Sequence, residues 1–424
     1  MSSNSQRSPA PDVDSLQGVF YDDFLTSGDI PLLRPAIARN AIAELNRVFS
    51  SGWIGEGDEV YRFEAALQEV LCADHVVTVN SGTSAIDLAL ELLSVKAGDT
   101  VISTSLTCAA TNIPLLRRGI RIQWADIDPR CAVLSPASVA ANIDENTKAI
   151  LTVDLHGVPS HYHELRKIAD DYGIPIVADC AQAIGATYAG RQAPAYADIC
   201  CYSFQSVKTL TTADGGAIVF NDPAFLKRAT KLRWFGIDRA KKAATTTPWF
   251  FDIDEAGFKY HMNNVMAAIG LSNLPHLGAV IAHQKAVAAA YDARVESNEW
   301  IQKLDYTSRQ TPIFPVYPLL ISDRNHFVQY MRANGIEANP LHQANDKLSA
   351  FHNSALVMAS RDGERGMNTV DPHLACLPTG YWIDQTRLDR IIETVNAYRG
   401  TNTVSRPLPP LSPPCNSIGD TIDS

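Results

Sequence analysis

Two charged residues, Asp179 and Lys208, stand directly after apolar runs that are typical of strands. Asp179 follows the run in IPIVADCAQAIGA, and Lys208 follows the run in CCYSFQSVKTLTTADGG. An amine can form a Schiff base with the aldehyde of pyridoxal phosphate, and a carboxylate can keep the ring nitrogen of that cofactor protonated. The pair therefore predicts a pyridoxal phosphate site with Asp179 and Lys208 as its catalytic residues.

Polar residues near this pair fit the same cofactor. The segment NSGTSAIDLALELL places Gly82 and Thr83 at the start of an amphipathic helix, where backbone N–H groups can hold a phosphate. Gln182 lies three residues after Asp179, on the same face of a helical turn, and Ser203 is expected to donate to the phosphate. Each residue alone also fits a helix cap, a turn or a solvated loop. Their combination favours the cofactor site, in which burial and a cationic ring would lower the pKa of the Lys208 amine.

Composition excludes several other classes of protein. The chain has 424 residues, 46% of them hydrophobic, and a net charge of −10. It therefore lacks a general excess of basic residues for binding nucleic acid. The eight cysteines form no CxxC pair, and we predict reduced thiols and no metal site. We see no secretion signal and no segment approaching the ~18 apolar residues of a membrane span, so we expect a cytoplasmic protein.

Apolar runs alternate with helix-like segments through the first two thirds of the chain, which predicts an α/β fold with a mostly parallel sheet. In such sheets ligands bind beyond the carboxyl ends of the strands, where Asn80, His156, Asp179 and Lys208 are expected. The predicted strands are His75–Val79, Thr100–Thr104, Ile120–Ala125, Ala149–Val153, Ile174–Ala178, Ile199–Phe204 and Ala217–Phe220, and the predicted helices are Thr83–Leu93, Ala109–Arg118, Ser135–Asn142 and Ser160–Tyr172.

The rest of the chain predicts a second, smaller α/β domain. A long helix is expected from His261 to about Ser297, broken at Pro275, followed by a strand-helix-strand region and a last helix near Gln385–Tyr398. We predict a disordered tail over residues 1–16, a cofactor-binding domain over 17–275, a small domain over 276–400 and a disordered proline-rich tail over 401–424.

A series of motifs over about Ile30 to Tyr398 resembles the DegT-type sugar aminotransferases, which are fold type I pyridoxal phosphate enzymes. The motifs occur in order as IPLLRP, SSGWIGEGDEVYRFEAAL, NSGTSAIDLAL, DLHGVPS, ADCAQAIGA, SFQSVKTLTTADGG, RWFGIDR, GFKYHMNNVMAAIGLSNL and LACLPTGYW. The resemblance implies a seven-stranded, mostly parallel sheet flanked by helices and a homodimer with shared active sites. It also implies that Lys208 bonds the cofactor aldehyde, Asp179 pairs with the ring nitrogen, Gln182 contacts the ring hydroxyl, and the phosphate is bound by Gly82, Thr83 and Ser203.

The chain departs from the family pattern at two places. Many members carry an aromatic residue that stacks on the cofactor where this chain has Cys108, and many have GFNYR where this chain has GFKYH. The second difference puts Lys259 where the resemblance implies an asparagine that reaches the partner's phosphate.

We therefore expect an aminotransferase that moves an amino group from an amino acid, most simply glutamate, to a keto sugar linked to a nucleotide. Candidate contacts for this anionic substrate are His156, Arg239 and His342. One alternative is a sugar dehydratase of the same fold, in which histidine replaces the Schiff-base lysine. The other is a non-catalytic regulator that keeps the fold.

Overall fold

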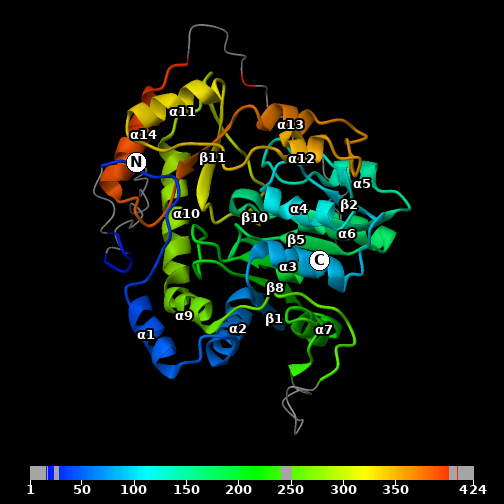
Figure 1. Ribbon diagram of the computed structural model, residues 1–424. Helices are drawn as coiled ribbons and strands as arrows, with labels where there is room; N and C mark the ends of the chain where they lie inside the picture. The colour runs from blue at the N-terminus through cyan, green and yellow to red at the C-terminus, as the bar shows by residue number, and fades with distance from the viewer. Residues whose placement is uncertain (1–15, 17, 23–27, 240–250, 401–407, 409–424) are drawn as a thin grey trace, which may run out of the picture.

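Short apolar runs buried on both sides build the central sheet of the molecule (Figure 1). The computed structural model describes residues 16, 18–22, 28–239, 251–400 and 408. Within them, eight strands form one sheet in the order β1-β8-β7-β5-β4-β2-β3-β12. The strands are β1 (His75–Val79), β2 (Thr100–Ser103), β3 (Arg121–Trp124), β4 (Thr147–Val153), β5 (Ile176–Asp179), β7 (Ile199–Ser203), β8 (Gly216–Phe220) and β12 (Val357–Met358).

All seven predicted strands are confirmed within a few residues. Strands from β12 to β7 pair in parallel, whereas β8 is antiparallel to both β7 and β1. The eighth strand, β12, was not predicted, because it has only two residues and pairs with β3 from far along the chain. The α/β fold class is confirmed.

Successive residues of the strands pack against two different layers of helices. In β4, for example, Ile150 joins the core beneath α2, α6 and α9, whereas Ala149 and Leu151 join the core beneath α3, α4 and α7. This alternation explains why the strands are apolar throughout. The helices of the two layers are α2 (Asp58–Leu71), α3 (Gly82–Leu92), α4 (Ala109–Arg117), α5 (Pro136–Asn142), α6 (Tyr162–Tyr172), α7 (Ala224–Leu232) and α9 (Asn264–Asn273).

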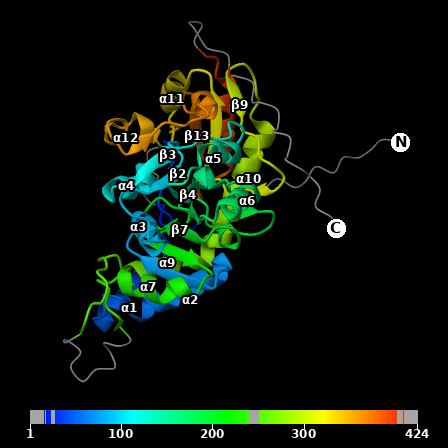
Figure 2. The ribbon, with the colours of Figure 1, turned by 90° about the vertical axis from the view of Figure 1, so that its right-hand side faces the viewer.

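A second, three-stranded antiparallel sheet has the order β13-β11-β9 and its own apolar core. Its strands are β9 (Ile301–Lys303), β11 (Val316–Ile321) and β13 (Leu374–Pro378), with helices α10 (Leu277–Arg294), α11 (Arg324–Ala333) and α14 (Gln385–Ala397) against it. Figure 2 shows this region at the end of the molecule opposite to α1 (Ala41–Ser51) and α2. The remaining short elements are β6 (Thr187–Tyr188), β10 (Gln310–Thr311), α12 (Ser349–His352) and α13 (Arg365–Val370).

The helix that connects the two sheets changes its winding at Pro275. There α9 gives way to the 3-10 turn Leu274–His276, and α10 follows directly. By length and composition, Asn264–Arg294 is apolar enough to cross a membrane, so the expectation that no segment reaches that threshold is wrong. Tyr291 and Val287 of this helix nevertheless lie in the core of the small sheet, as in the central helix of a globular protein.

The predicted domain limits remain a proposal, with the division at 275 falling inside the 3-10 turn. Both predicted disordered tails lie outside the described residues, apart from Leu16 and Leu408. Leu16 is buried in a small apolar cluster with Phe20 and Val280.

Candidate active site

Three predicted site residues lie at the carboxyl ends of neighbouring parallel strands. Asp179 is the last residue of β5, Ser203 is the last residue of β7, and His156 follows β4. Asp179 pairs in register with Val153 of β4 and with Cys201 of β7. The parallel pairing therefore brings residues from separate parts of the sequence to one edge of the sheet.

Asp179 is buried and held in one orientation. Its Oδ2 accepts a hydrogen bond of 2.7 Å from the Thr111 hydroxyl, and its Oδ1 accepts one of 3.0 Å from the Ala181 N–H. Thr107 lies 2.8 Å from Thr111, hydroxyl to hydroxyl. Burial raises the pKa of Asp179, while the hydrogen bond from Thr111 and the nearby Lys208 amine oppose that rise. A cation placed against this carboxylate would be strongly stabilised.

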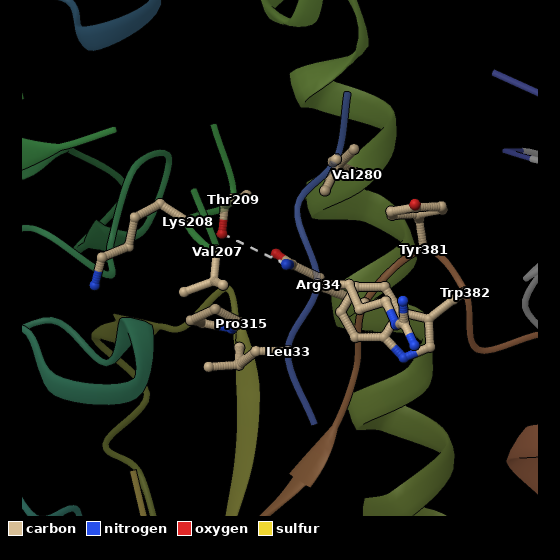
Figure 3. Close-up of a pocket in the computed structure, with 12 residues that line it drawn as sticks. Leu33, Arg34, Val207, Lys208, Thr209, Val280, Pro315, Tyr381 and Trp382 are labelled. Atoms are coloured by element: carbon tan, nitrogen blue, oxygen red, sulfur yellow. Dashed lines mark hydrogen bonds between the residues drawn. The ribbon is translucent and has the colours of Figure 1, made fainter. Parts of the chain in front are cut away.

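The amine of Lys208 lies within the electrostatic reach of Asp179. Burial lowers the pKa of Lys208, and the charges of Asp179 and Cys108 oppose this shift only in part. A lowered pKa increases the fraction of neutral, nucleophilic amine. Figure 3 shows the Lys208 side chain directed away from Tyr381 and Trp382, two of the residues that line a small cavity of about 20 Å³ beside its backbone. That cavity has room for about one water molecule and is not a substrate site.

Gln182 connects the buried His156 to the half-buried His342. Its Oε1 accepts a hydrogen bond of 2.8 Å from the backbone N–H of His156, and its Nε2 lies 3.1 Å from His342 Nε2. Burial, with help from the Lys208 charge, lowers the pKa of His342 to about 4, and burial lowers the pKa of His156 to about 3. Both rings are therefore neutral at pH 7. His156 has φ of 56°, a left-handed backbone conformation, and within the described residues its Nδ1 is buried without a hydrogen-bond partner.

Gly82 begins α3 directly against the end of β7. A Cβ on Gly82 would lie 2.7 Å from the Ser203 Cβ, so only glycine fits there without displacement. Ser81 caps the helix by accepting from the Ser84 N–H at 3.1 Å, which leaves other N–H groups of the first turn without an intrahelical partner. Thr83 follows Gly82 in this turn. The predicted phosphate-binding group, here called the phosphate cradle, therefore consists of the N-terminus of α3 and the nearby Ser203 hydroxyl.

These residues fit pyridoxal phosphate in chemistry and in placement. The structure provides the desolvated amine of Lys208 and the buried carboxylate of Asp179, which accepts a hydrogen bond from Thr111. It also provides the N-terminus of α3, where Gly82 leaves room beside Ser203. The groups match the aldehyde, the ring nitrogen and the phosphate of the cofactor. Thr111 was not predicted from the sequence, although its position in the first turn of α4, after β2, was the available signal.

Arg239 and Lys259 form a separate group around Trp234. Arg239 forms an ion pair with Glu56 (Nη1–Oε1, 2.6 Å), and its guanidinium lies 4.9 Å from the Trp234 ring centre. The Lys259 amine lies 4.0 Å from the same ring centre and 3.5 Å from His261 Nε2. None of these contacts involves Asp179 or Lys208.

Cys108 and His342 lie on two segments that contact each other. Cys108 is the residue before α4, and Asn345, three residues after His342, donates from its Nδ2 to the Thr107 carbonyl at 2.8 Å. Asn345 also accepts from Asn112 Nδ2 of α4 at 3.0 Å. The segment that carries His342 is thus attached to the start of α4, beside Cys108.

A fold of this kind, with an amine and a carboxylate at the ends of its parallel strands, is typical of a cofactor-dependent transferase. The sequence profile of the DegT/DnrJ/EryC1/StrS aminotransferase family matches residues 35–396. The chain belongs to this family, and it is an aminotransferase. The family resemblance seen in the sequence motifs is confirmed.

Individual relatives agree with this assignment. The chain is 30% identical over 263 residues to GDP-perosamine synthase from Vibrio cholerae, a match that covers 62% of this chain and 70% of the relative. The crystal structure of the sugar aminotransferase CalS13 from Micromonospora echinospora is similar with a TM-score of 0.81 and 31% identity, covering 87% of this chain and 99% of that one. A protein from Streptococcus pneumoniae, solved in its PLP form, is similar with a TM-score of 0.80 and 25% identity, covering 87% and 98%.

Proposed function

We propose that this aminotransferase uses pyridoxal phosphate to move an amino group from an amino acid, with glutamate as the expected donor, to a keto sugar linked to a nucleotide. The observation that carries the proposal is that the Lys208 amine and the buried Asp179 carboxylate lie close enough for each charge to shift the pKa of the other. The relative named GDP-perosamine synthase supports a nucleotide-linked sugar as the acceptor. The PLP form of a structural relative supports the cofactor.

Each residue of the site then has a role in binding or proton movement. The cofactor would supply an electron sink that stabilises negative charge at the substrate carbon. Asp179 would hold a proton on the ring nitrogen, oriented by Thr111, and Gln182 would bind the ring hydroxyl. Lys208 Nζ would bind the cofactor and, once released, carry the proton that leaves the donor's α-carbon. Gly82, Thr83 and Ser203 would bind the phosphate.

The neutral histidines suit a sugar better than a carboxylate. His156 and His342 can each donate and accept hydrogen bonds without a net charge, as sugar hydroxyl groups require. We propose that both line the sugar subsite, and that Cys108 lies where family members have a stacking aromatic residue. A smaller side chain there would leave the cofactor ring held mainly by its polar contacts.

We further propose that the active enzyme is a cytoplasmic homodimer. Exposed apolar side chains gather on α1, α2 and their connection, namely Ile42, Phe49, Trp53, Ile54 and Tyr61. Figures 1 and 2 both place α7 at the same end of the molecule as these helices. A patch of this kind is characteristic of a protein interface. In such a dimer Lys259 would reach the partner's cofactor phosphate, and Arg239 would contact the partner's substrate.

The proposed reaction can be tested with isotopic nitrogen. Purified holoenzyme is incubated with ¹⁵N-glutamate and a panel of nucleotide-linked keto sugars, and the products are analysed by mass spectrometry. We expect one sugar to gain ¹⁵N, and the Lys208→Ala variant to transfer none. Loss of oxygen from the sugar without gain of nitrogen would instead indicate the dehydratase. If no sugar in a broad panel reacts, the proposed class of acceptor is wrong.

A further inference from the structure

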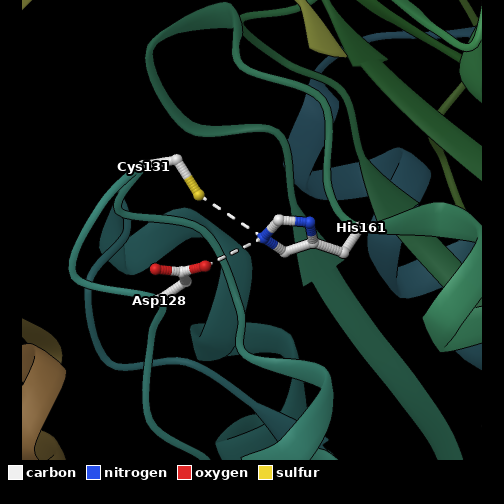
Figure 4. A group of neighbouring side chains, drawn as sticks. All are labelled: Asp128, Cys131 and His161. Atoms are coloured by element: carbon white, nitrogen blue, oxygen red, sulfur yellow. Dashed lines mark hydrogen bonds and ion pairs between the residues drawn. The ribbon is translucent and has the colours of Figure 1, made fainter. Parts of the chain in front are cut away.

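Three side chains outside the proposed active site bring a sulfur, a nitrogen and an oxygen donor together. The Cys131 Sγ lies 3.4 Å from His161 Nε2, and the same nitrogen lies 3.4 Å from Asp128 Oδ2 (Figure 4). All three donor atoms lie within 4.8 Å of one another. None of these side chains takes part in the contacts described around Asp179 and Lys208.

The backbone fixes this group from two separate elements. Asp128 and Cys131 lie on the reversal that follows β3, where the Asp128 N–H donates to the Val133 carbonyl at 2.8 Å. His161 is the residue before α6. The reversal also contacts the small domain, because the Asp305 N–H donates to the Arg130 carbonyl at 2.8 Å. The donors therefore lie on two backbone segments, one of which is hydrogen-bonded to the segment that follows β9.

The separation of Cys131 Sγ from His161 Nε2 matches tetrahedral zinc. With Zn–S near about 2.3 Å and Zn–N near about 2.0 Å, tetrahedral geometry separates the sulfur and nitrogen by about 3.5 Å. The observed 3.4 Å agrees with this value. Cys131 is only 2% exposed and His161 6% exposed, whereas the Asp128 side chain is 15% exposed and provides access from solvent.

Arg130 holds the Asp128 carboxylate in one orientation. Arg130 donates to both oxygens of Asp128, at 2.8 Å from Nη2 and 3.2 Å from Nε. Such a contact can orient a ligating carboxylate, since each oxygen has a second lone pair.

We propose that Asp128, Cys131 and His161 form a zinc site that connects the reversal after β3 to the start of α6, with a water molecule as the fourth ligand. Zinc would bind Cys131 as a thiolate and His161 as a neutral imidazole, and protons displaced from these atoms would go to solvent. The sequence did not predict this site, because its ligands are 30 residues apart and follow no known spacing.

The site can be tested on tag-free holoenzyme stripped of metal with a chelator. Zinc binding is measured by equilibrium dialysis with elemental analysis, for wild type and for the Cys131→Ser and His161→Gln variants. Matched controls are Cys72→Ser and His352→Gln, which alter an exposed cysteine and an exposed histidine elsewhere. We expect about one zinc per chain in wild type and both controls, and loss of that zinc in both site variants.

Two further measurements on wild-type protein keep the proposal testable if the variants do not fold. Cobalt substituted for zinc should give a thiolate-to-metal charge-transfer band, because sulfur is a ligand. Anomalous diffraction at the zinc edge should place a peak between the three donor atoms. Absence of stoichiometric zinc, a peak elsewhere, or zinc retained by a folded Cys131→Ser variant would overturn the proposal.

Discussion

At the scale of single residues, the chemistry depends on opposite effects of burial on an acid and a base. Burial raises the pKa of Asp179 and lowers that of Lys208, and each residue's charge opposes the shift of the other. A protonated ring nitrogen beside Asp179 would supply the positive charge that this carboxylate lacks in a desolvated site. The proposed cofactor therefore fits an electrostatic requirement that the side chains create.

The first prediction concerns the charge of Asp179. In Asp179→Asn we expect turnover to fall by orders of magnitude, because a neutral amide cannot keep the ring nitrogen protonated. Cofactor retention should change much less, since the phosphate cradle is intact. Single-turnover kinetics and a cofactor titration measure the two effects separately. Turnover near the wild-type rate would mean that Asp179 acts only as a structural cap.

At the scale of elements, the phosphate cradle depends on the close approach of the start of α3 to the end of β7. In Gly82→Ala the new Cβ would meet Ser203 at 2.7 Å, so the start of the helix must move. We predict weaker cofactor binding, by about tenfold or more, and a loss of stability of about 1–3 kcal/mol from overpacking. Cofactor titration and urea unfolding measure these quantities.

Gly278→Ala is the matched control, because Gly278 also lies in the first turn of a helix but has open space around it. We expect it to bind cofactor like wild type. Equal effects of the two substitutions would show that the Gly82 contact is not specific to the cradle.

A second prediction at this scale concerns Asp154, which follows β4 and ties it to the start of α6. Its carboxyl group accepts from the Ser160 N–H and hydroxyl and from the Tyr162 hydroxyl, each at 2.8 Å. Burial raises its pKa to about 6, against about 4 in an unfolded chain. Between these pH values the folded state keeps a proton that the unfolded state has lost, so stability should fall as pH rises from about 4 to about 6.

Asp154→Asn should remove this contribution, which is on the order of 3 kcal/mol across the interval. Urea unfolding at several pH values measures it, with Asp170→Asn on the exposed face of α6 as control. An unchanged pH slope in Asp154→Asn would contradict the raised pKa.

Local sequence patterns were sufficient for elements whose burial is uniform, and insufficient for contacts between distant segments. Parallel strands such as β5 and β7 are buried on both faces, so each is a readable apolar run. The Thr111 contact with Asp179 and the attachment of Asn345 to α4 were missed, because only the tertiary fold brings these residues together. The long helix with a break at Pro275 was also readable from its apolar pattern, and the break is the 3-10 turn Leu274–His276.

At the scale of the whole molecule, the exposed apolar patch on α1 and α2 predicts association. We expect Phe49→Asp to convert the proposed dimer to monomers and to reduce activity strongly, because a charge would be buried in the proposed interface. Sedimentation velocity and the amino-transfer assay measure both effects. Tyr172→Asp, which alters an exposed aromatic residue on α6, should leave both unchanged. A wild-type protein that is monomeric and fully active would contradict the shared-site dimer.

The most direct test of the central claim is to identify the lysine that holds the cofactor. Holoenzyme is reduced with borohydride, digested, and the modified peptide is sequenced by mass spectrometry, with Lys208→Ala and Lys227→Ala variants treated in parallel. The account predicts modification of Lys208 alone in wild type and in Lys227→Ala, and none in a folded Lys208→Ala protein. Specific modification of any other lysine would contradict it.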